Sequence, residues 1–120
     1  MREIQNGIEI FSTYGDKVGN IFFNEQHLYF ASGTLPIILK NVNSYTVDIL
    51  GSFFKYKGLV PEESAFKIDI NNSHGEFSIR MDKNYIYINQ GKLSLIWEAV
   101  GLSELKKIGI WLQKRSKELK

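Results

Sequence analysis

Apolar and polar residues alternate along most of the first ninety positions, in short segments divided by Gly, Asn and Asp. A period of two places every second side chain on one face, as in a half-buried β-strand, and these segments are rich in β-branched and aromatic residues. The pattern therefore predicts strands at 8–11, 20–23, 28–30, 37–40, 44–50, 52–57, 66–70, 77–81 and 85–88. Gly51 divides two of these segments, which form one bent strand if the chain bends there.

The clearest alternation lies between residues 65 and 89. Phe66, Ile68 and Ile70 share one face, and the same spacing recurs in the two following segments. Residues that favour turns separate the segments, so this region predicts a β-meander with one buried face. Earlier in the chain, Pro36 lacks a backbone N–H and should mark the beginning or the edge of its strand.

Residues 92–100 fit two patterns. The apolar side chains from Leu93 to Trp97 alternate as in a strand, whereas those from Leu93 to Val100 also fit the i, i+3, i+4, i+7 spacing of a helix. A helix here would join the segment after Gly101 in a helix-turn-helix. The preceding turn and the rhythm of the meander favour a strand.

Residues 103–119 are predicted to form an amphipathic helix that closes the β-structure. Ser103 is expected to cap the first turn, and Glu104 suits the positive end of the helix dipole. Gly109 weakens a helix by about 1 kcal/mol relative to Ala, which indicates close packing against its backbone. At about 100° per residue, Ile110 points towards the lysines. The apolar, core-closing stripe contains Leu105, Ile108, Trp111, Leu112 and Leu119, and the opposite arc contains Lys106, Lys107, Lys114, Lys117 and Lys120.

Charge is unevenly distributed along the 120 residues, a length that suits a single domain over 1–120. Residues 103–120 carry six basic and two acidic side chains, a net charge of +4, whereas the whole chain has a formal charge of +2. A mildly acidic body therefore carries a basic C-terminal segment. The lysines of this segment form a face, the lysine face, that is either only solvated or binds anionic groups.

The sequence lacks the motifs of the common catalytic classes. It contains no cysteine, which excludes thiol chemistry and disulfides. Its only two histidines, His27 and His74, do not have the spacing of a two-histidine zinc motif such as HExxH. No phosphate-binding glycine loop or nucleophile elbow occurs. We therefore predict no enzyme, catalytic residue, metal site or cofactor. The N-terminal residues do not form a signal peptide, and a soluble, cytoplasmic protein is expected.

The segment Gly19-Asn20-Ile21-Phe22-Phe23-Asn24-Glu25-Gln26-His27-Leu28-Tyr29-Phe30 resembles the early hairpin of GRAM and bacterial pleckstrin-homology-like domains. The apolar segment at 38–42 lies where those domains often place a strand. The resemblance implies an α+β fold of about seven to nine mostly antiparallel strands, in a partly open barrel or two-sheet sandwich closed by one C-terminal helix. Members of this class mostly bind lipids, peptides or other proteins.

Two functions are expected from these features. The first is a non-enzymatic binding or scaffolding module for a protein partner, whose sheet edge next to Pro36 accepts an added strand. The second is electrostatic attachment to nucleic acid or an anionic membrane through the lysine face. Salt dependence of binding separates the two.

Overall fold

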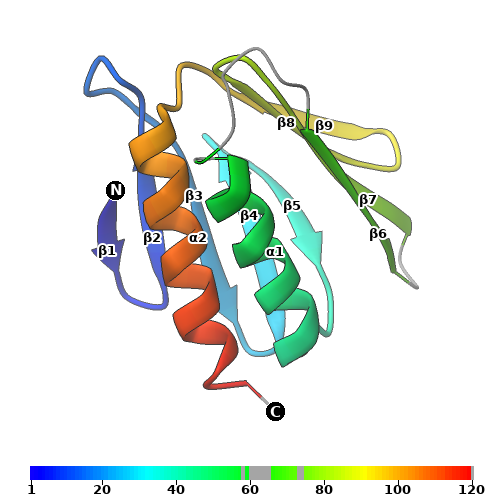
Figure 1. Ribbon diagram of the computed structural model, residues 1–120. Helices are drawn as coiled ribbons and strands as arrows, with labels where there is room; N and C mark the ends of the chain where they lie inside the picture. Colours follow the sequence, from blue (N-terminus) through cyan, green and yellow to red (C-terminus); the bar gives the residue numbers. More distant parts are fainter. Residues whose placement is uncertain (58, 60–65, 73–74, 120) are drawn as a thin grey trace.

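The computed structural model describes residues 1–57, 59, 66–72 and 75–119. Within these residues the chain forms an α+β fold of nine antiparallel strands in two sheets, together with two helices (Figure 1). The elements are β1 Arg2–Ile4, β2 Gly7–Phe11, β3 Lys17–Asn24, β4 His27–Ser32, β5 Leu35–Leu39, α1 Ser44–Lys57, β6 Phe66–Asn72, β7 Gly75–Asp82, β8 Tyr85–Gln90, β9 Leu93–Trp97 and α2 Leu102–Ser116.

Both sheets are simple meanders, in which each strand pairs with its neighbour in the chain. The first has the order β1-β2-β3-β4-β5 and the second the order β6-β7-β8-β9. Seven predicted strands outside 44–57 are confirmed, and 92–100 contains strand β9, so the helical alternative for that segment is wrong. Strand β1 was not predicted, because its three exposed residues carry no apolar alternation.

The prediction of strands at 44–50 and 52–57 is wrong, because this segment forms helix α1. The Asn43 side-chain oxygen accepts a hydrogen bond from the Thr46 N–H at 2.8 Å, which satisfies one free amide of the first turn. Buried residues then recur at helical spacing, namely Val47, Leu50, Gly51 and Phe54. The segment's aromatic and β-branched residues favour a strand only weakly, and burial of this stripe overrides that preference.

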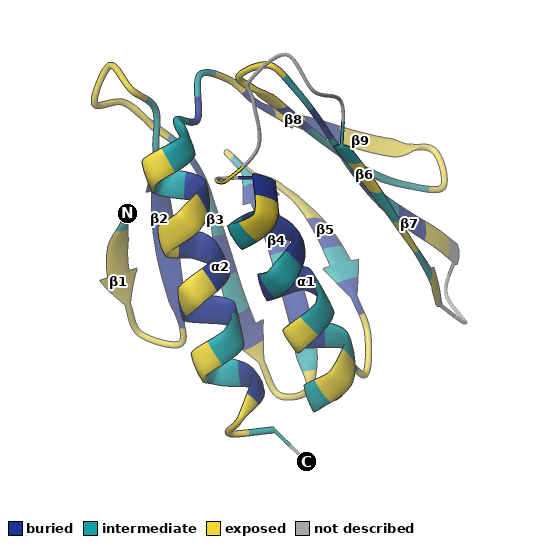
Figure 2. Cartoon of the chain, viewed as in Figure 1, coloured by how far each residue is buried: buried dark blue, intermediate teal, exposed yellow. Residues whose placement is uncertain are grey.

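The two helices lie side by side and antiparallel over one face of the five-stranded sheet (Figure 1). The four-stranded sheet closes the core from a second direction. Figure 2 shows both helices buried towards the sheets and exposed on their outer sides. The expected closure by one C-terminal helix is therefore corrected to closure by a helical pair.

Aromatic side chains join the layers. Phe53 of α1 stacks on Phe66 of β6, with ring centroids 4.7 Å apart. Trp97 of β9 is fully buried, its ring lies 6.4 Å from that of Phe30 in β4, and its Nε1–H donates to the Ala31 carbonyl oxygen at 3.1 Å. The second sheet is thus fastened to the first by a polar contact within an apolar core.

The helices approach each other most closely at two glycines. A Cβ added to Gly109 of α2 would lie 2.6 Å from the Gly51 carbonyl oxygen and 2.6 Å from the Lys55 amide nitrogen, both in α1. The close packing predicted at Gly109 is confirmed, and the packing partner is the unpredicted helix. Only a residue without a side chain permits this backbone contact.

Candidate functional site

The beginning of α2 is anchored by a carboxylate. Glu104 Oε1 accepts a hydrogen bond from the Met1 amine at 2.6 Å, and its Oε2 accepts one from the Phe11 N–H at 2.8 Å. Glu104 lies in the first turn, as predicted. The predicted cap at Ser103 is wrong, because Gly101 occupies the N-cap position and no side chain caps the helix. Glu104 therefore ties the helix to the first sheet.

Four residues of the predicted core-closing stripe are buried, namely Leu105, Ile108, Trp111 and Leu112. Leu119, the fifth, is only partly buried and lies beyond α2, which ends at Ser116 and not at the predicted residue 119. Trp111 is only 6% exposed, and its ring centroid lies 5.9 Å from that of Phe23 in β3. The Arg115 guanidinium lies 5.6 Å from the Trp111 ring and 5.4 Å from the Phe23 ring. Packing of this face fixes the rotation of α2 and hence the direction of its outer side chains.

The outer side of α2 and the lysine directly after its end form a surface that we call the lysine face: Lys106, Lys107, Ile110, Lys114 and Lys117. Ile110 is 48% exposed. Lysines at positions i−4, i−3 and i+4 are its neighbours on the helix surface, so three cations flank an apolar side chain. The predicted arc is confirmed for these four lysines, and Lys120 lies outside the described residues.

The lysine face differs electrostatically from the sheets. Several cations on the strands have carboxylate partners: Lys17 with Glu9, Lys67 with Asp69 and Arg80 with Asp82. Among the described residues, none of the four lysines on the face forms an ion pair. Like charges spaced three or four residues apart on a helix disfavour it by a few tenths of a kcal/mol per pair, about 0.2–0.5. An anionic partner would remove this repulsion.

Helix α1 extends this surface. A hollow of about 240 Å³ between the helices is lined by Ser52, Lys55, Tyr56, Leu59 and Gln113. Gln113 Nε2 donates to Ser52 Oγ at 3.0 Å, which links the two helices beneath it. Tyr56 and Leu59 are 61% and 64% exposed. Lysines and exposed apolar groups therefore occupy one continuous side of the molecule.

A second hollow, of about 220 Å³, lies on the other flank of α2. It is lined by Met1, Glu3, Lys107, Ile110, Trp111 and Lys114. Ile110 and Trp111 thus line the same hollow. The surface of α2 therefore has an apolar hollow between its lysines, and an extended or helical segment of a partner can fill this hollow.

The other candidate chemical groups take structural positions. His27 Nδ1 accepts a hydrogen bond from the Asn41 N–H at 3.1 Å. His74 and residues 60–65 lie outside the described residues. Within the described ranges, no three side chains of the metal-binding types are grouped to hold an ion. Neither α1 nor α2 has the length and apolar content of a membrane-spanning helix.

The strand edge next to Pro36 is only partly available. Pro36 lies in β5, an edge strand, as predicted. Gln90 Nε2 donates to the Ile38 carbonyl oxygen at 2.7 Å, so this carbonyl points away from β4 and is already occupied. Pro36 lies two residues before Ile38, so its backbone groups point to the same side of the strand, and it has no N–H to donate there. The edge thus lacks consecutive free groups for an added strand.

A scan against protein-family models, a search of curated proteins and a search of solved structures found no match.

Sequence reasoning located the lysines and Ile110 but not the α1 part of the surface. The sequence did contain a signal for helix α1: Asn43 can cap a helix, and apolar residues follow at i, i+3 and i+4 spacing from Val47. A helix over this segment places Tyr56 on the side opposite the buried stripe.

Proposed function

We propose that the protein is a non-enzymatic binding module that docks an acidic, partly apolar segment of a partner protein on the outer side of its helices. The observation that carries the proposal is the lysine face, where four lysines have no ion-pair partner among the described residues and three of them, Lys106, Lys107 and Lys114, neighbour the exposed Ile110. Protein interfaces commonly place apolar anchors at the centre and charged groups at the rim.

The hollows on both flanks of α2 support a protein partner over a purely phosphate-bearing one. They are bordered by Ile110, Tyr56 and Leu59 as well as by lysines. Apolar side chains of a partner gain by burial there, whereas a phosphate backbone does not. The resemblance of residues 19–30 to GRAM and pleckstrin-homology-like domains fits this proposal, since that class consists mostly of binding modules.

Binding of a fluorescent peptide of alternating Glu and Leu residues tests the proposal. The double variant Lys106→Glu/Lys114→Glu should weaken binding at least tenfold, because both lysines flank Ile110 on the lysine face. The matched control is Lys83→Glu/Lys92→Glu, which makes the same change in net charge at exposed turns of the second sheet. The control should bind the peptide almost as wild type does.

Ile110→Ser separates a protein ligand from nucleic acid. It should weaken peptide binding about three- to tenfold, the scale of losing one partly exposed apolar contact. Binding of a DNA duplex through phosphate contacts alone would be unaffected by this substitution and would fall with salt at a log–log slope of about −0.9 per phosphate. Tight duplex binding with weak peptide binding would overturn the proposal.

A further inference from the structure

Four strands form the edges of the two sheets, and three of them carry a protecting feature. Strand β1 has only three residues, two of them charged. Strand β5 contains Pro36 and has its Ile38 carbonyl occupied by Gln90. Strand β9 lies against the first sheet, where Trp97 donates to the Ala31 carbonyl oxygen. Short length, proline and coverage are the usual ways in which proteins prevent edge pairing.

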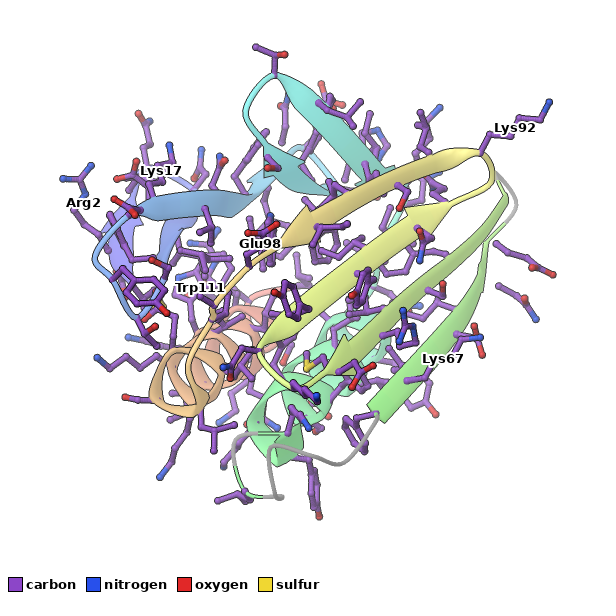
Figure 3. The ribbon with its side chains drawn as sticks, turned by 90° about the horizontal axis from the view of Figure 1, so that it is seen from above. Arg2, Lys17, Lys67, Lys92, Glu98 and Trp111 are labelled. Carbon is purple, nitrogen blue, oxygen red and sulfur yellow. The ribbon has the colours of Figure 1, made fainter. Side chains whose placement is uncertain are left out.

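The fourth edge, β6, is neither short nor interrupted by proline, and its two charged side chains, Lys67 and Asp69, are opposite in sign. It has seven residues, contains no proline, and pairs with β7 along its whole length. Figure 3 shows Lys67 on this strand, at the opposite side of the second sheet from β9. Backbone groups directed away from β7 along an edge of this length are a template for another strand.

The inward side of β6 is incompletely buried. Phe66, Ile68 and Ile70 pack only partly against the core. In contrast, their neighbours Phe77 and Ile79 on β7 are fully buried. A further strand beside β6 would cover these three apolar side chains, as β6 itself covers those of β7.

The charges on the outward side of β6 can pair with those of a second, antiparallel copy of the strand. Lys67 and Asp69 are 56% and 67% exposed, and their charged atoms lie 3.4 Å apart. If two copies of β6 run antiparallel about a two-fold axis at Ile68, Lys67 of each copy lies opposite Asp69 of the other. The same register places Phe66 opposite Ile70 on the inward side. Both sides of the strand thus favour one register.

We infer that β6 is a self-association edge, through which two copies of the chain pair antiparallel about Ile68 and join their second sheets into one continuous sheet. This is an isologous contact, in which both copies use the same surface. One strand pair is small for an interface, so the dissociation constant is expected to be on the order of 10 μM. The lysine face is not part of this contact.

Sedimentation equilibrium over a range of protein concentrations tests the inference. Wild type should associate to a dimer. Lys67→Asp and Asp69→Lys each place like charges opposite each other twice, and each should weaken association at least tenfold. An equimolar mixture of these two variants restores opposite charges at both positions and should form a heterodimer near wild-type strength. Lys92→Asp, at an exposed turn, is the matched control and should dimerise normally.

The exposure of Lys67 and Asp69 means that both variants should fold, which circular dichroism checks. Three results would overturn the inference: a monomer up to about 1 mM, association that neither charge reversal weakens, or single variants that stay monomeric when mixed. The last two results would mean that the copies associate through another surface, or that β6 pairs with a strand of a different protein. Lys106→Glu/Lys114→Glu should dimerise as wild type, so failure here and failure of the proposed function are distinguishable.

Discussion

Glu9 lies on the outer face of the first sheet between two cations. Lys17 Nζ is 2.9 Å from its Oε2, and Arg2 Nε donates to its Oε1 at 2.6 Å. The hydrogen bond from Lys17 and that from Arg2 lower the pKa of Glu9 below its ordinary value of 4.5, against a smaller opposing effect of burial. Figure 3 shows Arg2 and Lys17 close together at this corner of the sheet. The native state therefore favours the ionised carboxylate.

This lowered pKa predicts a pH dependence of stability. The contribution of Glu9 is fully present above its unfolded-state pKa and is lost as the pH falls through the lower folded-state pKa. Glu9→Gln removes the titrating group, so the difference in unfolding free energy between wild type and variant should shrink as the pH falls from about 6 to about 3. Urea unfolding at several pH values measures this difference.

Glu98→Gln is the control, because Glu98 is exposed. Its difference from wild type over the same pH range gives the baseline for removing one carboxylate from the surface. A difference for Glu9→Gln that does not change with pH would contradict the assignment of Glu9 as an ion-paired carboxylate.

At the scale of elements, the packing of α1 on α2 decides where the lysine face points. Gly51 and Gly109 allow the two helix backbones to meet, and the stripe around Trp111 sets the rotation of α2. Helices packed through small residues approach more closely than those separated by large side chains. The outer faces of both helices are consequently presented as one surface.

Gly109→Ala tests this contact. Alanine is the better helix former by about 1 kcal/mol, which would stabilise an isolated helix. Here its Cβ would meet backbone atoms of Gly51 and Lys55, which cannot move aside as a flexible side chain can. Crowding of this kind costs about 1–3 kcal/mol, so a net loss of stability is expected.

Ser103→Ala is the matched control on the same helix. Ser103 is exposed and does not cap α2, so its loss should change the unfolding free energy by less than about 0.5 kcal/mol. Urea unfolding compares the two variants. Greater stability of Gly109→Ala than of wild type would show that the helices do not meet at this residue.

The elements differ in how well they could be predicted. Most strands were predictable because alternation is a strong local signal, and α2 was predictable because its two faces differ so clearly in polarity. Helix α1 was not, since Phe53, Phe54 and Tyr56 suit a strand locally and Gly51 resembles a bend. Its helical state depends on burying a stripe against α2, which is a contact distant in sequence. Gly51 permits the close contact between the two helices, a role that the sequence of α1 alone does not reveal.

In the whole molecule, four lysines without ion-pair partners among the described residues lie on the outer side of α2 or directly after its end, whereas several cations of the strands are paired with carboxylates. The lysine arc was predictable from helical periodicity alone, because Lys106, Lys107 and Lys114 belong to one helix and Lys117 directly follows it. Tyr56 and Leu59 could not be added to the surface without α1. The β6 edge required knowledge of which strands end each sheet. A dimer through β6 would present two lysine faces, which would strengthen binding to a partner with repeated acidic segments.

The central claim is that partners bind on the outer side of α1 and α2. Titration of isotope-labelled protein with the Glu–Leu peptide, followed by amide chemical shifts, tests it most directly. The account predicts that shifts concentrate in residues 106–117 and 52–59, with amides of the second sheet almost unchanged. Shifts concentrated on strands β6 to β9, with residues 106–117 unaffected, would contradict it.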